Sequence, residues 1–536
     1  MNENRILCAM VDLSRDGVMR VQTLKRYAEL IKKAGYNALG LYIEDVYEID
    51  GEPYFGHLRG RYSQNELKEI NDFCKSIGIT AIPYIQTLAH LEGIFKWHAY
   101  DDIKDIANIM LVGEDRTYEL IDKMFAAMKK CFRSRSINIG MDEARYLGLG
   151  EYVKKFGYKK PDEILAEHLS RVVETAKKYG FKPSMWSDMF IRTVHDGEYY
   201  PEKPNYKAVA AQKANIPENV TPVYWDYYHD RKRDYERFIK MHELLSDSII
   251  FAGGVRTSFS FVPHNLNSAK KMRAAMDVCR EHGVKDIVIT TWGDDGGECS
   301  PFSVLPTLLF LIERYKNGST RKNSDEKFYK LFGIKAKAFY DLDLLDIYNG
   351  LSHASFSKLF LFNDPFIGFF DYHIKDGANK YYKSLALKYR RLIKTTAEYS
   401  YIFENAYRLA DFLSVKAELG NITRKAYLSG DTASLKKICD ETYPAAIKKL
   451  RALYASVKRV WSRENKPFGA EVQALRFGGL ITRLEDCRKT LKNYIDGNID
   501  AIKELKEPTL PYADITKPIL ATHLRIASPG VIDGNL

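Results

Sequence analysis

The feature that most constrains this chain is an alternation, over its first 320 residues, between short apolar runs and amphipathic segments. The alternation repeats about eight times; each apolar run has the length of a β-strand, and each intervening segment has helical spacing. The expected strands are Leu7–Val11, Ala38–Ile43, Ala81–Ile85, Ile137–Met141, Pro183–Trp186, Pro222–Trp225, Ile249–Ala252 and Ile287–Thr291. Because strands that alternate with helices form parallel sheets, we predict an α/β fold, a (β/α)8 barrel.

Helix boundaries inside this region support the alternation. Ser63 and Glu66 have the spacing of a capping box. Pro161 stands where the first turn of a helix tolerates a residue without an N–H. Asn265 or Asn267 is a suitable N-cap for the helix before the last expected strand. These signals place helices between the strands, as the barrel requires.

The pattern changes after about residue 320. The long, Lys-rich amphipathic segments that follow are Lys327–Leu344, Lys380–Ser414, Asp431–Arg463 and Ala470–Ile495. We therefore predict two domains, a catalytic barrel over residues 1–320 and an α-helical C-terminal domain over residues 321–536. No proline-rich linker separates them, so we expect the two domains to pack rigidly together.

Composition and the N-terminus bear on where the protein works. Apolar residues make up 45% of the chain and charged residues 28%, as in ordinary soluble proteins. No window has the run of about eighteen apolar residues that a membrane span needs, and Met1–Arg5 lead into a strand without a signal-peptide pattern. We therefore expect a cytoplasmic protein that does not engage membranes.

The net charge of +11 would suit an anionic partner such as nucleic acid. Lys and Arg, however, are spread along the chain, often within a turn of Asp or Glu, and no nucleic-acid recognition motif accompanies them. The seven cysteines are scattered, and no pair has metal-ligand or redox-motif spacing. We expect solvated helix faces rather than a nucleic-acid surface, reduced thiols, and neither metal nor cofactor.

In a barrel the chemistry belongs to the C-terminal ends of the strands, and polar, charged or aromatic residues follow nearly every expected strand. Two adjacent carboxylates, Asp142 and Glu143, come directly after the fourth strand. Neighbours on a strand point to opposite sides, so one carboxyl can donate a proton from a drier niche while the other remains ionised. Taken alone, the pair is also typical of a helix N-terminus.

Three of the five tryptophans also fall at expected strand ends. Trp186, Trp225 and Trp292 are each followed by an aspartate within two residues. A sugar ring needs acceptors for its hydroxyls and a flat apolar face for its C–H surface, and carboxylates beside indoles supply both. Trp225 has an alternative orientation away from the site, since Tyr224 and Asp226 share the opposite face of its strand. The strand ends therefore favour a carbohydrate ligand.

These motifs support a resemblance to a known family. Asn138–Ala144 resembles the catalytic motif of the family 20 glycoside hydrolases, the β-N-acetylhexosaminidases. Asp12–Arg15 is similar to the first-strand arginine motif of that family, Tyr224–Asp226 to its Tyr-x-Asp, and Trp292–Asp294 to its Trp-x-Glu, here with Asp. The motifs occur in the family's order, each at an expected strand end.

Two further segments, Glu52–Gly56 and Trp461–Glu471, resemble a subgroup that lacks the family's N-terminal α/β domain and begins with the barrel. The resemblance therefore covers most of the chain. Trp461 and the loop after it could pack as core, or reach the pocket of a second copy in a homodimer.

What the resemblance implies is retention of configuration assisted by the substrate. The C2-acetamido oxygen of the sugar would attack the anomeric carbon and form an oxazolinium ion, so no enzyme nucleophile is needed. Glu143 would act as general acid and then base, Asp142 would hold the acetamido nitrogen, and Tyr224 would donate a hydrogen bond to the acetamido oxygen. We also expect nearby indoles to desolvate Glu143.

The resemblance also implies the contacts to a small glycan. The substrate-binding residues would be Arg15, Trp186, Trp225, Asp226, Trp292 and Asp294. To these we add His90, which follows the third expected strand, as a residue that supports the contacts rather than a catalytic one. Arg15 would bind the hydroxyls O3 and O4, unless it only bridges loops through an ion pair with Asp12. Asp294 would take O4 and O6, and Glu298 competes with it for the place of the family's glutamate.

One stretch departs from the subgroup. Tryptophan is expected at or near the positions of Arg256 and Ser258, where this chain carries a guanidinium and a hydroxyl. We hypothesise that Arg256 adapts the pocket to a substrate with an anionic substituent or to a different aglycone. The alternative is a structural ion pair under the loop.

Three functions remain open at this point. The first is an exo-β-N-acetylhexosaminidase that releases terminal GlcNAc or GalNAc. The second is a retaining β-glycosidase with two enzyme carboxylates, for instance Glu143 and Asp294. The third is a sugar-binding barrel without catalysis, which the altered wall at Arg256 would allow.

Overall fold

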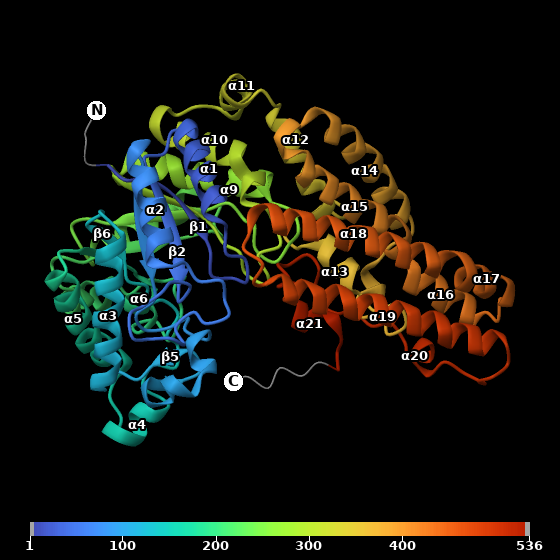
Figure 1. Ribbon diagram of the computed structural model, residues 1–536, viewed down its shortest axis with the longest axis horizontal. Coiled ribbons are helices and arrows are strands. Elements are labelled where there is room, and N and C mark those ends of the chain that lie inside the picture. The colour runs from blue at the N-terminus through green and yellow to red at the C-terminus, as the bar shows by residue number, and fades with distance from the viewer. Residues whose placement is uncertain (1–4, 531–536) are drawn as a thin grey trace.

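The computed structural model of the protein describes residues 5–530. Residues 1–4, on which the signal-peptide prediction partly depends, and residues 531–536 lie outside the described residues. Eight parallel strands close into a barrel in the order β1-β10-β9-β8-β7-β6-β3-β2, which confirms the predicted (β/α)8 fold (Figure 1). The strands are β1 (Leu7–Asp12), β2 (Ala38–Glu44), β3 (Thr80–Ile85), β6 (Ser136–Asn138), β7 (Lys182–Trp186), β8 (Thr221–Trp225), β9 (Ile250–Gly254) and β10 (Asp286–Thr291).

Helices follow every barrel strand and cover the outside of the sheet (Figure 1). They are α1 (Val21–Ala34), α2 (Gln64–Ser76), α3 (Asp115–Cys131), α4 (Glu151–Phe156), α5 (Pro161–Lys178), α6 (Asp188–Arg192), α7 (Tyr206–Ala211), α8 (Lys232–Glu243), α9 (Asn265–Glu281) and α10 (Leu305–Asn317). A small hairpin of β4 (Lys104–Ile106) and β5 (Ile109–Met110) lies in the loop between β3 and α3. With helices outside and side chains inside, both faces of the barrel sheet are buried, as in β2, where all seven residues are buried.

The predicted helix starts are correct at two places and wrong at one. Ser63 and Glu66 form the capping box of α2, and Pro161 is the first residue of α5. Asn265, in contrast, is already inside α9, and His264 precedes it as the N-cap. The Asn265 amide donates instead to backbone carbonyls of other helices, because it is buried at their junction.

The fourth barrel strand ends earlier than predicted. β6 stops at Asn138, and Gly140 and Met141 have positive φ values of 73° and 72°. A Cβ at position 140 would lie 2.0 Å from the Gln86 side chain, so only glycine fits this turn. The turn takes Asp142 and Glu143 out of the strand and into the loop above it.

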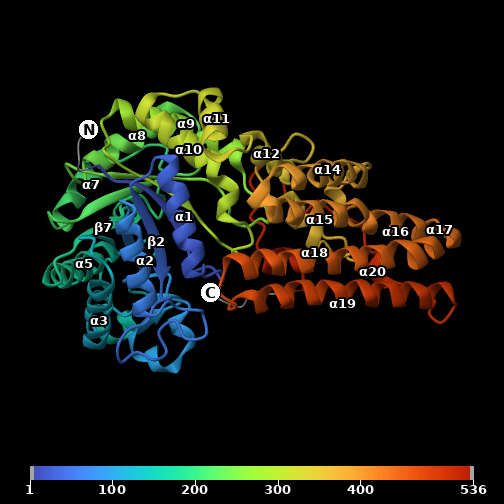
Figure 2. The same cartoon turned by 45° about the horizontal axis from the view of Figure 1, so that its top comes forward.

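The region after the barrel is helical, with no further barrel strand in the described residues. Its helices are α11 (Arg321–Phe332), α12 (Ala336–Tyr340), α13 (Phe356–Phe362), α14 (Ala378–Leu392), α15 (Ser400–Lys416), α16 (Leu419–Leu428), α17 (Thr432–Lys437), α18 (Tyr443–Glu464), α19 (Ala470–Ile495), α20 (Lys503–Lys506) and α21 (His523–Ala527). Helices α18 and α19 lie side by side and extend away from the barrel (Figure 2). The predicted segment 380–414 is two helices, because short 3-10 turns separate α14 from α15. The division into two domains at residue 320 stays a prediction.

The loop between α18 and α19 docks on the barrel. The backbone N–H of Lys466 donates to the carbonyl of Val18 at 2.7 Å, and that of Arg20 donates to the carbonyl of Glu464 at 2.9 Å. Trp461 is buried beside this contact, and its indole N–H donates to the Lys466 carbonyl at 3.0 Å. Trp461 therefore packs as core between barrel and helices.

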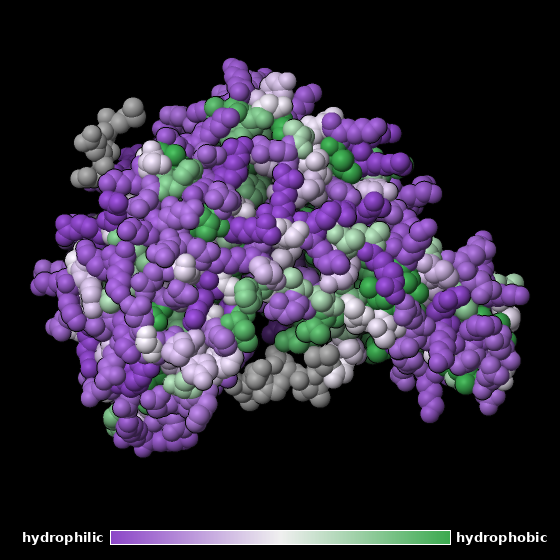
Figure 3. Space-filling view, in the orientation of Figure 1, coloured by the Kyte–Doolittle hydropathy of each residue, from purple (hydrophilic) through white to green (hydrophobic). Residues whose placement is uncertain are grey.

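The surface in Figure 3 is mostly hydrophilic, and apolar residues gather around a hollow between the barrel and the helices. All seven cysteines are buried and unpaired. Among residues 5–530, no helix combines the length and the apolar character needed to cross a bilayer.

Candidate active site

A cavity of about 470 Å³ opens at the C-terminal ends of the barrel strands. Eight of the ten predicted site residues line this cavity, namely Arg15, His90, Asp142, Glu143, Trp186, Trp225, Trp292 and Asp294. The C-terminal segment 518–520 lines it as well, so the helical region closes one side of a barrel site. The other two predicted residues, Tyr224 and Asp226, do not line it.

Asp142 is held as an anion at the base of the cavity. Its Oδ1 accepts a hydrogen bond from the Gln86 amide at 2.8 Å, and its Oδ2 lies 3.2 Å from Nε2 of His90. Burial alone would raise the pKa of Asp142, but the charge on His90 and the hydrogen bonds outweigh it and lower the pKa. Burial likewise opposes the charge on His90, yet Asp142 raises the pKa of His90 to about 10. At neutral pH the two form a carboxylate–imidazolium pair.

Glu143 stands in a different environment. It has a positive φ of 53°, and its backbone N–H donates to the Asp188 carboxylate at 3.1 Å. Its carboxylate lies 3.0 Å from Arg145 and 3.8 Å from Arg192, with 35% of the side chain exposed. The expectation that indoles desolvate Glu143 is therefore wrong, because cations and solvent surround its carboxylate.

Asp188 is a functional neighbour that the predictions missed. It is fully buried, and burial together with the nearby charge of Asp142 raises its pKa to about 6, although Arg192 opposes this. Arg192 donates to the same Asp188 oxygen that holds the backbone of Glu143, at 2.9 Å. The sequence predicts the aspartate after Trp186 only as a sugar acceptor, and its position two residues after the indole is the signal that could have drawn attention to it.

Arg15 and Asp294 face the cavity together. Nε of Arg15 lies 3.4 Å from Oδ1 of Asp294, and Nη1 of Arg15 contacts Glu44. The ion pair of Arg15 with Asp12 that was the alternative does not form, since Asp12 accepts from Ser14 and from the Gly293 N–H. Arg15 is thus oriented by Glu44 and remains open to a ligand.

Glu298 does not compete with Asp294 for the cavity. Its carboxylate contacts Lys358 of α13, and it accepts from Arg476 of α19 at 2.8 Å. Only 1% of its side chain is exposed, against 31% for Asp294. Asp294 is therefore the one of the two that can reach a ligand.

The three predicted tryptophans form an aromatic wall. The rings of Trp186 and Trp292 are 6.0 Å apart, and Trp292 meets Tyr42 edge-on at 4.7 Å. Trp225 stacks on Tyr227 at 5.6 Å. The wall offers the flat apolar faces on which sugar C–H groups or an acetyl group can pack.

Tyr224 and Asp226 lie on the opposite face of β8. Tyr224 is fully buried, stacks on His242 of α8 at 4.5 Å, and donates to Asp226 at 2.7 Å. Strand alternation turns Trp225 and Tyr227 to the cavity and these two residues to the helices. The prediction that Tyr224 and Asp226 contact the substrate directly is therefore wrong. The alternative that Trp225 points away from the site is also wrong, because Trp225 lines the cavity. Asp226 instead accepts backbone N–H groups of the loop that carries Tyr227.

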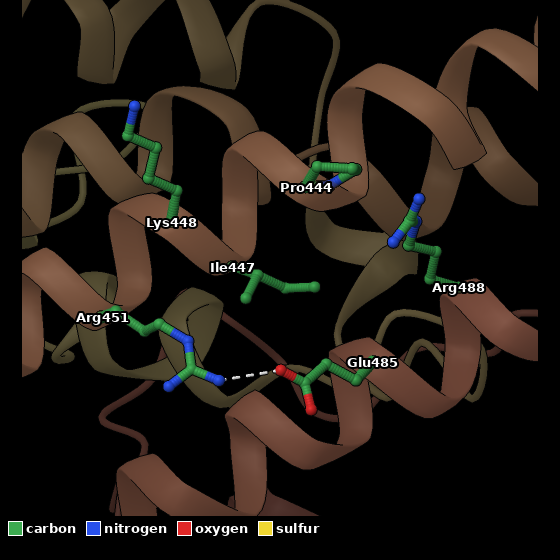
Figure 4. A pocket seen from close by; sticks show the side chains of 6 residues that line it. All are labelled: Pro444, Ile447, Lys448, Arg451, Glu485 and Arg488. Carbon is green, nitrogen blue, oxygen red and sulfur yellow. Dashed lines mark hydrogen bonds and ion pairs between the residues drawn. The ribbon is translucent and has the colours of Figure 1, made fainter.

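A second hollow, of about 510 Å³, lies on the surface between α18 and α19 (Figure 4). Four charged side chains line it, Lys448, Arg451, Glu485 and Arg488, and two of them, Arg451 and Glu485, pair with each other at 2.9 Å and are half-exposed. Exposed charges of this kind are solvated and screened, so we expect them to bind a ligand only weakly. The barrel cavity is the better candidate for an active site, because Asp142 and Glu143 line it in two different electrostatic environments.

Carboxylates and indoles at the strand ends of a (β/α)8 barrel are groups that can hold a sugar, and the family models identify the class as a glycoside hydrolase. Residues 12–234 match the model of the glycosyl hydrolase family 20 catalytic domain, and residues 337–521 match that of the Glycoside Hydrolase 20C C-terminal domain. The two matches span about three quarters of the chain. The chain belongs to glycoside hydrolase family 20.

Individual relatives are distant. Hexosaminidase D of Bos taurus is 23% identical over 347 residues, which cover 59% of this chain and 94% of the relative. Hexosaminidase D of Homo sapiens is 24% identical over 220 residues, or 39% and 43% of the two chains. A solved GH20 exo β-N-acetylglucosaminidase from Vibrio harveyi superposes with a TM-score of 0.47 at 15% identity, covering 63% of this chain and 58% of that one. The chain thus spans about half the length of the human relative and of the Vibrio enzyme.

Proposed function

We propose that this protein is an exo-β-N-acetylhexosaminidase that releases terminal β-linked GlcNAc or GalNAc from oligosaccharides with retention of configuration. One observation carries the proposal: Asp142 and Glu143 share a cavity but are held in opposite environments. Asp142 is buried and ionised beside His90. Glu143 lies at the solvent-accessible side, where it can meet both a leaving group and water.

The fixed, ionised carboxylate of Asp142 suits substrate-assisted hydrolysis, and Glu143 lines the same cavity as the acid and base of the proposed reaction. The acetamido oxygen of the sugar attacks the anomeric carbon while Glu143 gives its proton to the departing glycosidic oxygen. The resulting oxazolinium carries positive charge, which the fixed carboxylate of Asp142 stabilises without reorganising. Water then attacks the anomeric carbon, Glu143 takes a proton from it, and the acetamido group is restored.

The acetamido group and the hydroxyls each need a place. Trp186, Trp225 and Trp292 are the proposed wall around the acetyl methyl. Tyr227 takes the role first expected of Tyr224, because it is the tyrosine of this loop that stacks on Trp225 inside the cavity. Arg15 and Asp294 would bind ring hydroxyls. The cytoplasmic location, the homodimer and the absence of a cofactor stay predictions.

The test is a panel of 4-nitrophenyl β-glycosides that differ only at C2 and C4, assayed with the wild type, Glu143→Gln and the matched control Glu151→Gln. Glu151 is half-exposed on α4 and pairs with Lys154. We expect turnover of the 2-acetamido sugars, a loss of about 10²- to 10⁴-fold in kcat/KM in Glu143→Gln, and no loss in Glu151→Gln.

Asp142→Asn separates the mechanisms. If Asp142 acts on the acetamido group, its loss lowers kcat more than it changes KM. Equal turnover of a β-glucoside with a hydroxyl at C2 would contradict substrate assistance and favour an enzyme nucleophile such as Asp294. If the wild type binds these glycosides without hydrolysing them, the protein is a sugar-binding barrel rather than an enzyme.

A further inference from the structure

Two basic side chains on the cavity wall after β9 form no ion pair with any carboxylate of residues 5–530. Arg256 follows β9, Lys271 lies on the second turn of α9, and both line the cavity. Lys270, the exposed neighbour, pairs with Asp230 at 2.8 Å. Within residues 5–530, neither Arg256 nor Lys271 has a carboxylate oxygen within 4 Å. The structural ion pair considered as an alternative for Arg256 therefore does not form in this part of the chain.

Arg256 is held in place but not neutralised. Its Nη1 donates to the His353 carbonyl at 3.0 Å, and its Nη2 donates to the Ser355 hydroxyl at 3.2 Å. These bonds use two of the five N–H donors of a guanidinium, and both acceptors are uncharged. The carboxylate whose charge acts on it, that of Asp346, is occupied by His264 at 3.0 Å and by hydroxyl donors. The guanidinium is thus oriented, with donors left over.

Lys271 adds a second charge to the same wall. Burial lowers the pKa of both Lys271 and Arg256, and the positive charge of Arg256 lowers that of Lys271 further. Both side chains are half-buried, and the carboxylates that act on them, Asp346 on Arg256 and Asp226 and Asp230 on Lys271, oppose this lowering without forming an ion pair. Holding two like charges together in this way is unfavourable, and a bound anion would relieve the cost. On the remainder of the cavity wall the charges are paired, Arg15 with Asp294 and His90 with Asp142.

We propose that Arg256 and Lys271 form a subsite for an oxyanion carried by the glycan, a sulfate or phosphate ester or a carboxylate. The inference rests on the proposed function, since the anion belongs to a sugar in the same cavity. A guanidinium fork and an ammonium together match an acceptor group with several charged oxygens, whereas neutral hydroxyls need no net charge. The anion can sit on the terminal N-acetylhexosamine or on the residue to which it is linked.

Two pairs of substrates separate these sources. The first pair is 4-nitrophenyl β-N-acetylglucosaminide and its 6-O-sulfate. The second pair consists of two disaccharides, one with GlcNAc β-linked to glucuronate and the other with GlcNAc β-linked to glucose. We expect the wild type to prefer the anionic member of one pair. Lys271→Gln and Arg256→Gln should each lower that ratio of kcat/KM by about tenfold or more, while Lys270→Gln leaves it unchanged. The pair whose ratio changes identifies the source, and unchanged ratios for both pairs in both variants would overturn the subsite.

Binding measured by calorimetry keeps the subsite and the proposed function apart. N-acetylglucosamine 6-sulfate, N-acetylglucosamine and the two disaccharides are titrated into the wild type, Lys271→Gln and Lys270→Gln, with Asp142→Asn as background where turnover intervenes. Tighter binding of a charged ligand that is lost only in Lys271→Gln supports the subsite, even if no hexosaminide is hydrolysed. Equal affinity for charged and neutral ligands overturns it, even if hydrolysis is found. The Arg256 side chain also holds two loops together, so Arg256→Gln could fail to fold. In that case Lys271→Gln decides the question.

Discussion

The loop after β10 carries two kinds of acidic residue within five positions, and they do different work. Asp294 opens into the cavity, where Arg15 is its one ion-pair partner among residues 5–530. Asp295 and Glu298 are sealed between the barrel and the helices by two cations, Lys358 and Arg476. The comparison teaches that residue type does not separate a ligand-binding carboxylate from a structural one. What separates them is how many cations already satisfy each carboxylate, and whether solvent can reach it.

The sealed group is balanced in charge. Fully buried Lys358 lies 2.7 Å from Asp295 and also contacts Glu298, while Arg476 contacts the two carboxylates at 2.8 Å each. These four side chains come from the β10 loop, α13 and α19, so the network joins the barrel to the helical region. Removal of either cation would leave a buried carboxylate uncompensated.

The largest expected effect breaks the sealed side. Lys358→Met should destabilise the protein by about 3–5 kcal/mol, because breaking a buried ion pair leaves its partners charged and dry. Urea denaturation monitored by tryptophan fluorescence measures it. Lys337→Met is the matched control, since Lys337 is 77% exposed and its pair with Asp341 should contribute under about 1 kcal/mol. Equal losses in the two variants would contradict the comparison.

The next effect sharpens the contrast between neighbours. Asp294→Asn should lower kcat/KM for an aryl β-N-acetylglucosaminide by about 10- to 100-fold, since a charged hydrogen bond to the sugar is lost, with little change in stability. Glu298→Gln should instead lower the denaturation midpoint and leave kcat/KM nearly unchanged. Kinetics and denaturation curves of both variants decide the matter. The idea fails if Asp294→Asn keeps full activity while Glu298→Gln loses it without loss of stability.

The smallest effect concerns a buried carboxyl, Glu464, that forms no ion pair within the described part of the chain. Glu464 accepts hydrogen bonds from Ser300 at 2.6 Å and from Tyr401 at 2.5 Å, and burial raises its pKa from 4.5 to about 7. The folded protein therefore keeps a proton that the unfolded chain loses above pH 4.5. Its contribution to stability is complete below that pH and is lost as pH rises to about 7, by at most about 1.4 kcal/mol per pH unit.

Glu464→Gln should remove this dependence. The difference in unfolding free energy between pH 5 and pH 7.5 should become smaller by about 2 kcal/mol than in the wild type. Denaturation curves at the two pH values measure it, and Glu151→Gln on exposed α4 provides the control. An unchanged pH difference in Glu464→Gln would show that the carboxyl titrates alike in the folded and unfolded states.

Much of the site was predictable because barrel strands obey local rules. The apolar runs and turns placed the strand ends, and the rule that chemistry lies at those ends brought Arg15, Asp142 and Trp292 together, although 277 positions separate the first from the last. The predictions failed where orientation mattered. Alternation along β8 puts Tyr224 and Trp225 on opposite faces, but it does not say which face is the cavity.

The sequence by itself determined the eight-strand barrel, the helical region after it, and the carboxylate pair and indoles at the strand ends, because strand and helix periodicities are properties of neighbouring residues. Only the tertiary structure decided that Asp294 is open and Glu298 closed, that Asp188 holds the backbone of Glu143, and that Arg256 and Lys271 share a cavity wall where no carboxylate of residues 5–530 pairs with them. Each of these outcomes depends on which distant cations and carboxylates meet in space, since a charge is satisfied or left open by partners that can lie far away along the chain.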